Sequence, residues 1–139
     1  MLNEEVKDYV NKLTGQITSI ESIWLFGSRV NRTYRPDSDW DLIVFGTPET
    51  LDELSQNPDF NKENIDLLVV YNDIDFKEPW PTHTVNRKQK SGSLLDWQWN
   101  KLNERIAFYF GAKPIINGQG EETFEVELNM LTANRIYPE

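Results

Sequence analysis

The sequence predicts a protein of the α/β (α+β) class, with a small mixed β-sheet and helices packed on it. Three short apolar runs have the length and composition of buried strands, at residues 22–26, 40–45 and 64–71. Helix signals precede and separate these runs, and the connections are short, which is typical of helices and strands around one core. The 139 residues, 38% of them hydrophobic, are enough for one domain. We expect a single domain over residues 1–139, with a core at about 20–72 and a less predictable flank at 72–139.

Two helices are predicted from their caps and periodicity. The first begins after Asn3, a suitable N-cap, and ends at Gly15. Its apolar side chains recur on one helical face, at Leu2, Val6, Tyr9, Val10 and Leu13. The second follows the strand 40–45, because Thr47 offers a capping oxygen and Pro48 suits the first helical position. It is expected to end near residues 57–58.

The second half carries weaker signals. Residues 72–93 include Pro79-Trp80-Pro81 and a basic cluster (Arg87, Lys88, Lys90), and are expected to form an exposed, charged loop. Segment 94–99 alternates loosely, and segment 102–110 fits a short helix ending at Gly111. Residues 123–130 alternate strictly, which predicts a half-buried strand with Phe124, Val126, Leu128 and Met130 on one side. Extra C-terminal strands are therefore expected.

Charge and composition disfavour several functions. The net charge of −9 opposes extended nucleic-acid binding, which needs a basic face, and favours a small anionic ligand held through metal ions or a basic protein partner. The absence of cysteine excludes disulfides and thiolate metal sites. The apolar runs are too short to cross a membrane, and the acidic N-terminus lacks a secretory signal, so a cytoplasmic location is expected.

Three aspartates stand at the starts of two predicted strands. Asp39 and Asp41 are two positions apart, so in a strand they project to one side. At about 5 Å and an effective dielectric near 20, two carboxylates repel by roughly 3 kcal/mol. A cation or solvent must offset this repulsion, and Mg²⁺ suits such oxygen ligands. Asp66 opens the next strand, so the three carboxylates are expected to hold two metal ions, as in phosphoryl-transfer sites.

The dipeptide Gly27-Ser28 follows the first strand directly. Glycine permits a close backbone approach to a ligand, and amides at a helix start can bind an anion. A phosphate held there, beside metal ions, would make a site for a nucleoside triphosphate. An EF-hand loop over residues 37–48 is excluded, because its sixth position is Leu42 and its twelfth is Pro48.

Plainer interpretations stay open for several of these residues. Asp39 and Asp41 also fit a polar loop edge, and Ser28 also fits a helix cap. The three arginines that follow the turn, Arg29, Arg32 and Arg35, fit a solvated rim better than three ligand contacts. The rings of Trp97 and Trp99 suit core packing better than base stacking, and His83 suits a surface position.

The spacing of these motifs resembles a known family. Gly27-Ser28, ten intervening residues and Asp39-Trp40-Asp41-Leu42 are similar to the signature of the DNA polymerase β-like nucleotidyltransferase superfamily, in particular its minimal nucleotidyltransferase branch. The resemblance covers residues 20–72 and implies that fold. It implies that Asp39, Asp41 and Asp66 bind Mg²⁺ and that Asp66 is the base. It also implies that Gly27, Ser28 and Arg29 bind the nucleotide.

By this resemblance, the chain transfers a nucleoside monophosphate, AMP from ATP or the equivalent from another nucleoside triphosphate, to a hydroxyl acceptor. A partner protein is one such acceptor, as in antitoxin-type minimal nucleotidyltransferases. One alternative is a catalytically silent member that acts as a partner-binding module, and another is a small-molecule, antibiotic-type enzyme. Addition to RNA ends is disfavoured by the charge.

Overall fold

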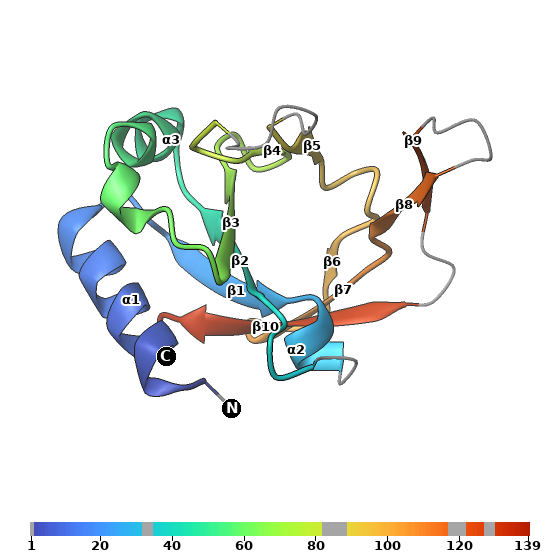
Figure 1. The fold of residues 1–139 in the computed structure, drawn as a ribbon, viewed down its shortest axis with the longest axis horizontal. Helices are drawn as coiled ribbons and strands as arrows, with labels where there is room; N and C mark the ends of the chain where they lie inside the picture. Colours follow the sequence, from blue (N-terminus) through green and yellow to red (C-terminus); the bar gives the residue numbers. More distant parts are fainter. Residues whose placement is uncertain (1, 32–34, 82–88, 117–121, 127–129) are drawn as a thin grey trace.

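A computed structural model describes residues 2–31, 35–81, 89–116, 122–126 and 130–139 (Figure 1). The helices are α1 (Glu4–Gln16), α2 (Ser28–Asn31), α3 (Pro48–Ser55) and the 3₁₀ helix η1 (Pro58–Phe60). The strands are β1 (Ser22–Phe26), β2 (Trp40–Phe45), β3 (Ile65–Val70), β4 (Asp75–Lys77), β5 (Ser91–Ser93), β6 (Asn100–Lys101), β7 (Ile106–Tyr109), β8 (Ala112–Ile116), β9 (Glu122–Val126) and β10 (Leu131–Tyr137). None of the described helices is long and apolar enough to cross a membrane.

The main sheet combines strands from both halves of the chain. Its order is β5-β4-β3-β2-β1-β10-β7-β6, and β8 and β9 form a separate two-stranded sheet. The pair β2–β3 is parallel, whereas the other pairs of the main sheet are antiparallel. The predicted mixed sheet and its extra C-terminal strands are thus confirmed. A single domain over residues 1–139 stays a prediction.

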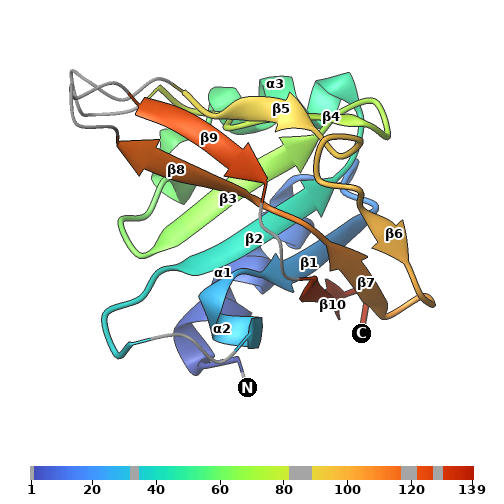
Figure 2. The same ribbon diagram turned by 90° about the vertical axis from the view of Figure 1, so that its right-hand side faces the viewer.

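The helices cover one face of this sheet. Figure 2 shows β1, β2 and β3 side by side with α1 behind them. The Asn3 side chain accepts a hydrogen bond from the Val6 amide at 2.9 Å, so the predicted N-cap of α1 is confirmed. In α3, Pro48 occupies the start, and the Thr47 amide donates to the Thr50 hydroxyl at 2.9 Å. Apolar side chains of α1 and α3 pack against alternate residues of β1, β2 and β3 to form the first core.

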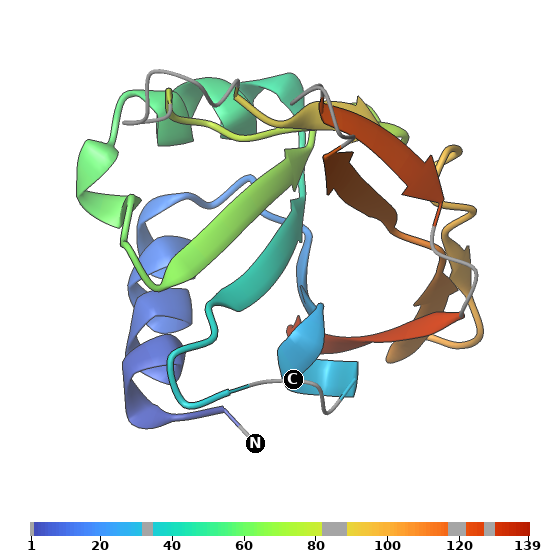
Figure 3. The same cartoon turned by 45° about the vertical axis from the view of Figure 1, so that its right-hand side comes forward.

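The opposite face of the sheet carries an aromatic cluster. The main sheet curls, so that β6, β7 and the β8–β9 hairpin lie across from α1 (Figure 3). Ring centroids inside this curl lie 4.8–6.5 Å apart in tilted or edge-to-face pairs. The cluster consists of Trp24, Phe26, Phe45, Phe76, Trp97, Trp99 and Tyr109. Trp97 and Trp99 are half-buried in it, in agreement with the packing interpretation.

Two expectations for the second half are wrong. Residues 72–93 are not wholly an exposed loop: they include β4 and β5, and the buried Trp80 donates its indole N–H to the Leu54 carbonyl at 2.7 Å. Segment 102–110 is not a helix, because 106–109 form β7, which pairs with β6 and β10. A short apolar run satisfies either periodicity, and the pairing partners decide it.

The last predicted strand, 123–130, is confirmed over the part that the structure describes, 123–126. β9 covers 122–126, whereas residues 127–129, and with them the position of Leu128, lie outside the described ranges. Met130, expected on the buried side, is 57% exposed. Segment 94–99 forms turns rather than regular structure.

Candidate active site

The parallel pairing of β2 and β3 places two predicted carboxylates opposite each other. Asp41 and Asp66 are register partners at the beginnings of these strands. Their neighbours Trp40, Leu42 and Ile65 belong to the core beneath α1. Because side chains alternate along a strand, Asp41 and Asp66 face the opposite side, which carries the aromatic cluster.

The two carboxylates interact strongly. The pKa of Asp41 is raised from 3.8 to about 7, first by burial and then by the neighbouring charge of Asp66, a hydrogen bond with the Asp66 side chain and the charge of Asp39, against an opposing effect of Lys90. Asp41 therefore holds a proton well above the usual range for an aspartate and is hydrogen-bonded to the Asp66 side chain. This pair has the hard oxygen donors that Mg²⁺ prefers, and one or two protein carboxylates suffice for that ion.

Asp39 occupies a different position from the one expected. It is exposed and precedes β2 rather than lying within it. Its charge still acts on Asp41. Within the described ranges, however, no three acidic or histidine side chains gather closely enough to hold a metal ion by themselves. The structure thus pairs Asp41 with Asp66, and the three-carboxylate, two-ion site stays a prediction.

The Gly27-Ser28 turn lies directly against Asp41. Phe26, the last residue of β1, is the cross-strand partner of Asp41, and α2 begins at Ser28 as the anion-binding hypothesis required. Gly27 has a φ of 77°, and a Cβ atom there would lie 2.1 Å from Oδ2 of Asp41. Glycine is needed at this position for its left-handed conformation and for the carboxylate that it contacts.

The C-terminal strands hold this turn in place. The Gly27 amide donates to the Tyr109 hydroxyl at 2.9 Å, and Tyr109 on β7 is only 2% exposed. The Asn31 side chain donates to the Gly27 carbonyl at 2.8 Å and accepts from the Thr132 amide at 3.0 Å. Sequence reasoning missed Tyr109 and Asn31, since their partners lie 82 and 101 residues away and leave no local pattern.

A family model corresponds to this part of the fold. Residues 4–78, more than half of the chain, match the family described as polymerase beta, nucleotidyltransferase. The chain belongs to this nucleotidyltransferase family. No curated protein and no solved structure matches it.

In this member of the nucleotidyltransferase family, Arg29 contacts the loop that leads to the acids. Its guanidinium donates to the Ser38 carbonyl at 2.8 Å and to the Pro36 carbonyl at 3.4 Å. The guanidinium carbon also lies 4.4 Å from the centroid of the Trp40 ring, a cation–π contact. Arg29 therefore fixes the backbone on both sides of Asp37. A contact between Arg29 and a phosphate stays a prediction.

Lys90 is the one member of the predicted basic cluster that the structure describes, since residues 82–88, which include His83, lie outside the described ranges. Its side chain is exposed, as expected, and its positive charge lowers the pKa of Asp41. Lys90 therefore belongs to the electrostatic surroundings of the carboxylate pair, which the sequence pattern did not indicate.

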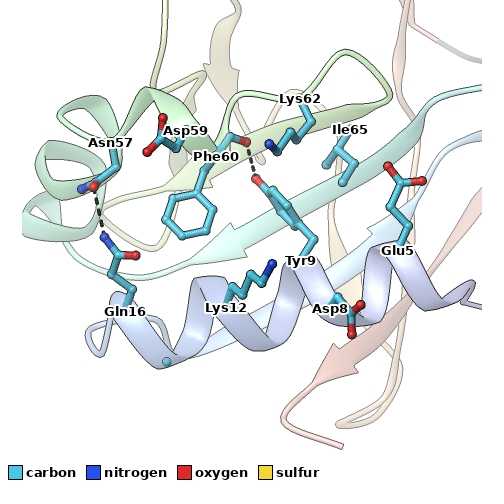
Figure 4. Close-up of a pocket in the computed structure, with 11 residues that line it drawn as sticks. Glu5, Asp8, Tyr9, Lys12, Gln16, Asn57, Asp59, Phe60, Lys62 and Ile65 are labelled. Atoms are coloured by element: carbon cyan, nitrogen blue, oxygen red, sulfur yellow. Dashed lines mark hydrogen bonds between the residues drawn. The ribbon is translucent and has the colours of Figure 1, made fainter.

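A pocket of about 920 Å³ lies on the helix side of the sheet, between α1 and residues 57–65 (Figure 4). The Tyr9 hydroxyl donates to the Phe60 carbonyl at 2.8 Å, and burial raises the pKa of Tyr9. Ile65 lines the pocket, whereas the next residue, Asp66, faces the other side of the sheet. The sheet therefore separates this pocket from the carboxylates.

Proposed function

We propose that the chain is a Mg²⁺-dependent nucleotidyltransferase that moves a nucleoside monophosphate, AMP from ATP, onto a hydroxyl acceptor. One observation carries the proposal: Asp41 and Asp66 are register partners whose side chains are hydrogen-bonded beside the Gly27 turn. Two half-buried acids so close together are destabilising when both are ionised, unless a cation offsets their repulsion. Membership of the nucleotidyltransferase family supports the same chemistry.

Each group at the site has a role in the proposed reaction. The acceptor oxygen forms a bond to the α-phosphorus, the bond to the bridging oxygen breaks, and pyrophosphate leaves. Gly27 and Ser28 hold the triphosphate, because α2 starts there and the absent Cβ leaves room near Asp41. Asp66 accepts the proton of the attacking hydroxyl.

Asp41, Asp66 and Asp39 would hold Mg²⁺ in this proposal. When bound, the ion neutralises the negative charge that develops on the phosphoryl oxygens. The protein keeps these acids on the ends of packed strands, so the site is positioned before the substrate arrives. Tyr109 contributes by fixing the Gly27 amide.

The test is transfer of label from α-labelled ATP in the presence of Mg²⁺. A lysate of the source organism supplies acceptors, including partner proteins, and each of the other α-labelled triphosphates checks the base preference. The wild type should label an acceptor, and Asp41→Asn should not. The matched control is Asp37→Asn, which removes a charge from the exposed loop that precedes β2. Equal labelling by the wild type and the Asp41 variant would refute the proposal.

A further inference from the structure

Lys90 lies on the same face of the sheet as the carboxylate pair. In the β4–β5 pairing, Phe76 faces Gly92 and Lys77 faces Ser91. The register continues by one residue, since the Glu78 amide donates to the Lys90 carbonyl at 2.8 Å. Side chains alternate along the strand, so Lys90 projects to the side of Gly92.

Contacts at Gly92 identify that side. A Cβ atom on Gly92 would lie 2.7 Å from Cζ of Phe76, whose ring belongs to the aromatic cluster. Phe76 in turn faces Val70 across β3–β4, and Val70, like Asp66, is on the face away from α1. Lys90 and Asp66 therefore share one face, two strands apart, at a lateral spacing of about 10 Å.

The long lysine side chain and the curl of the sheet shorten this gap. The Lys90 charge acts on Asp41, which lies one strand further along. The Lys90 backbone amide donates to the Glu78 carboxylate at 3.2 Å, which fixes the backbone from which the side chain projects. The Lys90 side chain is exposed, so its ammonium can be reached by a ligand on this face.

The strand order assigns this cation to one side of the reaction. From β1 to β5, the site presents the Gly27-Ser28 turn, then Asp41, then Asp66, and then Lys90. In phosphoryl transfer, the attacking and leaving oxygens lie roughly in line on opposite sides of phosphorus. If the leaving pyrophosphate occupies the turn, the acceptor approaches from the side of Asp66 and Lys90.

We propose that Lys90 forms part of the acceptor site, where its ammonium binds an anionic group, a phosphate or carboxylate, close to the attacking hydroxyl. This inference rests on the proposed function and narrows its acceptor class. Lys90 would supply a local positive charge for an anionic acceptor on a protein whose net charge is −9.

The test uses the complete chain saturated with Mg²⁺ and a non-hydrolysable ATP mimic, so that the triphosphate position is filled. Binding of inorganic phosphate to this complex is then measured by titration calorimetry. Lys90→Gln should weaken phosphate binding by about tenfold, the loss expected for one charge-assisted hydrogen bond, and Lys90→Arg should retain most of it. Both variants should bind the mimic as the wild type does.

Lys77→Gln is the matched control. Lys77 is exposed on the neighbouring strand, but it faces Val69, a residue of the core on the other side of the sheet. Lys77→Gln removes the same charge as Lys90→Gln. If the Lys90 charge acts on phosphate locally, the affinity of Lys77→Gln for phosphate should stay within about twofold of the wild-type value.

The outcomes separate the two proposals. If Lys90→Gln binds phosphate as the wild type does, or if the wild-type complex binds no phosphate, the acceptor assignment is wrong. A tenfold loss in affinity for the mimic itself would place Lys90 on the nucleotide side and also overturn it. If instead the wild type binds no mimic with Mg²⁺, the proposed function fails before Lys90 is examined.

Discussion

Replacing Asp41 by asparagine should stabilise the protein at neutral and alkaline pH. The amide has nearly the same shape and still donates a hydrogen bond to Asp66, but it removes a charge that is half-buried beside a second carboxylate. The pKa of Asp41 rises from 3.8 to about 7 on folding. Between these values the native state binds a proton that the unfolded state has lost, so native stability falls as the pH rises from about 4 to about 7.

The size of the effect follows from the same values. One pKa unit corresponds to about 1.4 kcal/mol, so the full difference corresponds to about 4 kcal/mol. Asp41 is half-buried, so solvent screening should reduce this to about 1–2 kcal/mol. We therefore expect the free energy of unfolding of Asp41→Asn to exceed that of the wild type by about 1–2 kcal/mol at pH 8 and to equal it near pH 4.

Urea unfolding at a series of pH values, without Mg²⁺, measures this difference. The informative quantity is the change in the free energy of unfolding between pH 4 and pH 8, compared with that of Asp37→Asn, which removes an exposed carboxylate from the loop before β2. If Asp41→Asn loses as much stability as the wild type over this range, or is the less stable of the two at pH 8, the argument from burial and repulsion is refuted.

Further expectations follow from the same contacts. Gly27→Ala should destabilise the protein by about 2 kcal/mol or more in urea unfolding, because of its positive φ and the Asp41 carboxylate. Gly15→Ala, with nothing within 4 Å of the added Cβ, should be neutral or stabilising, and equal losses in both would contradict this. Tyr109→Phe should cost about 1–3 kcal/mol, since the Gly27 amide loses its acceptor; an unchanged unfolding midpoint would show that water replaces the hydroxyl. Calorimetry at pH 6 in buffers of different ionisation enthalpy should show proton release when Mg²⁺ binds, because the ion displaces the Asp41 proton. Metal binding without proton release would argue that Mg²⁺ binds elsewhere. Asp66→Asn should lower both the affinity for Mg²⁺ and the transfer of label.

Local signals in the first half were enough to predict its fold. The strands 22–26 and 40–45 match the structure because each is an apolar run bounded by polar or turn residues, and the cap at Asn3 acts within four residues of itself. The second half depends on pairing between distant segments. β5 is Ser-Gly-Ser, which has no strand propensity of its own and forms against β4.

The residues of the candidate site likewise fall into those that local sequence signals predict and those that depend on distant pairing. The spacing of Gly27, Asp41 and Asp66 was readable because each follows or begins a strand with a strong local pattern. Tyr109 lies in a run that fits a helix or a strand equally well, and its hydroxyl acts on a glycine 82 residues away. Lys90 lies in a charged segment, and only the register of β3, β4 and β5 shows which face it occupies.

The C-terminal strands support the candidate site, although they lie outside the segment that matches the family model. The family model ends at residue 78, yet β1, which carries the Gly27 turn, has β10 as its second neighbour in the sheet. Without β10, the backbone of β1 would lose one set of partners, and the Thr132 amide would no longer anchor Asn31. A destabilising carboxylate pair requires a rigid support, because any relaxation that separates Asp41 from Asp66 would relieve the repulsion and disrupt the proposed cation site. The aromatic cluster and β10 supply that support, which explains why the second half of this chain packs around the same face that carries the acids.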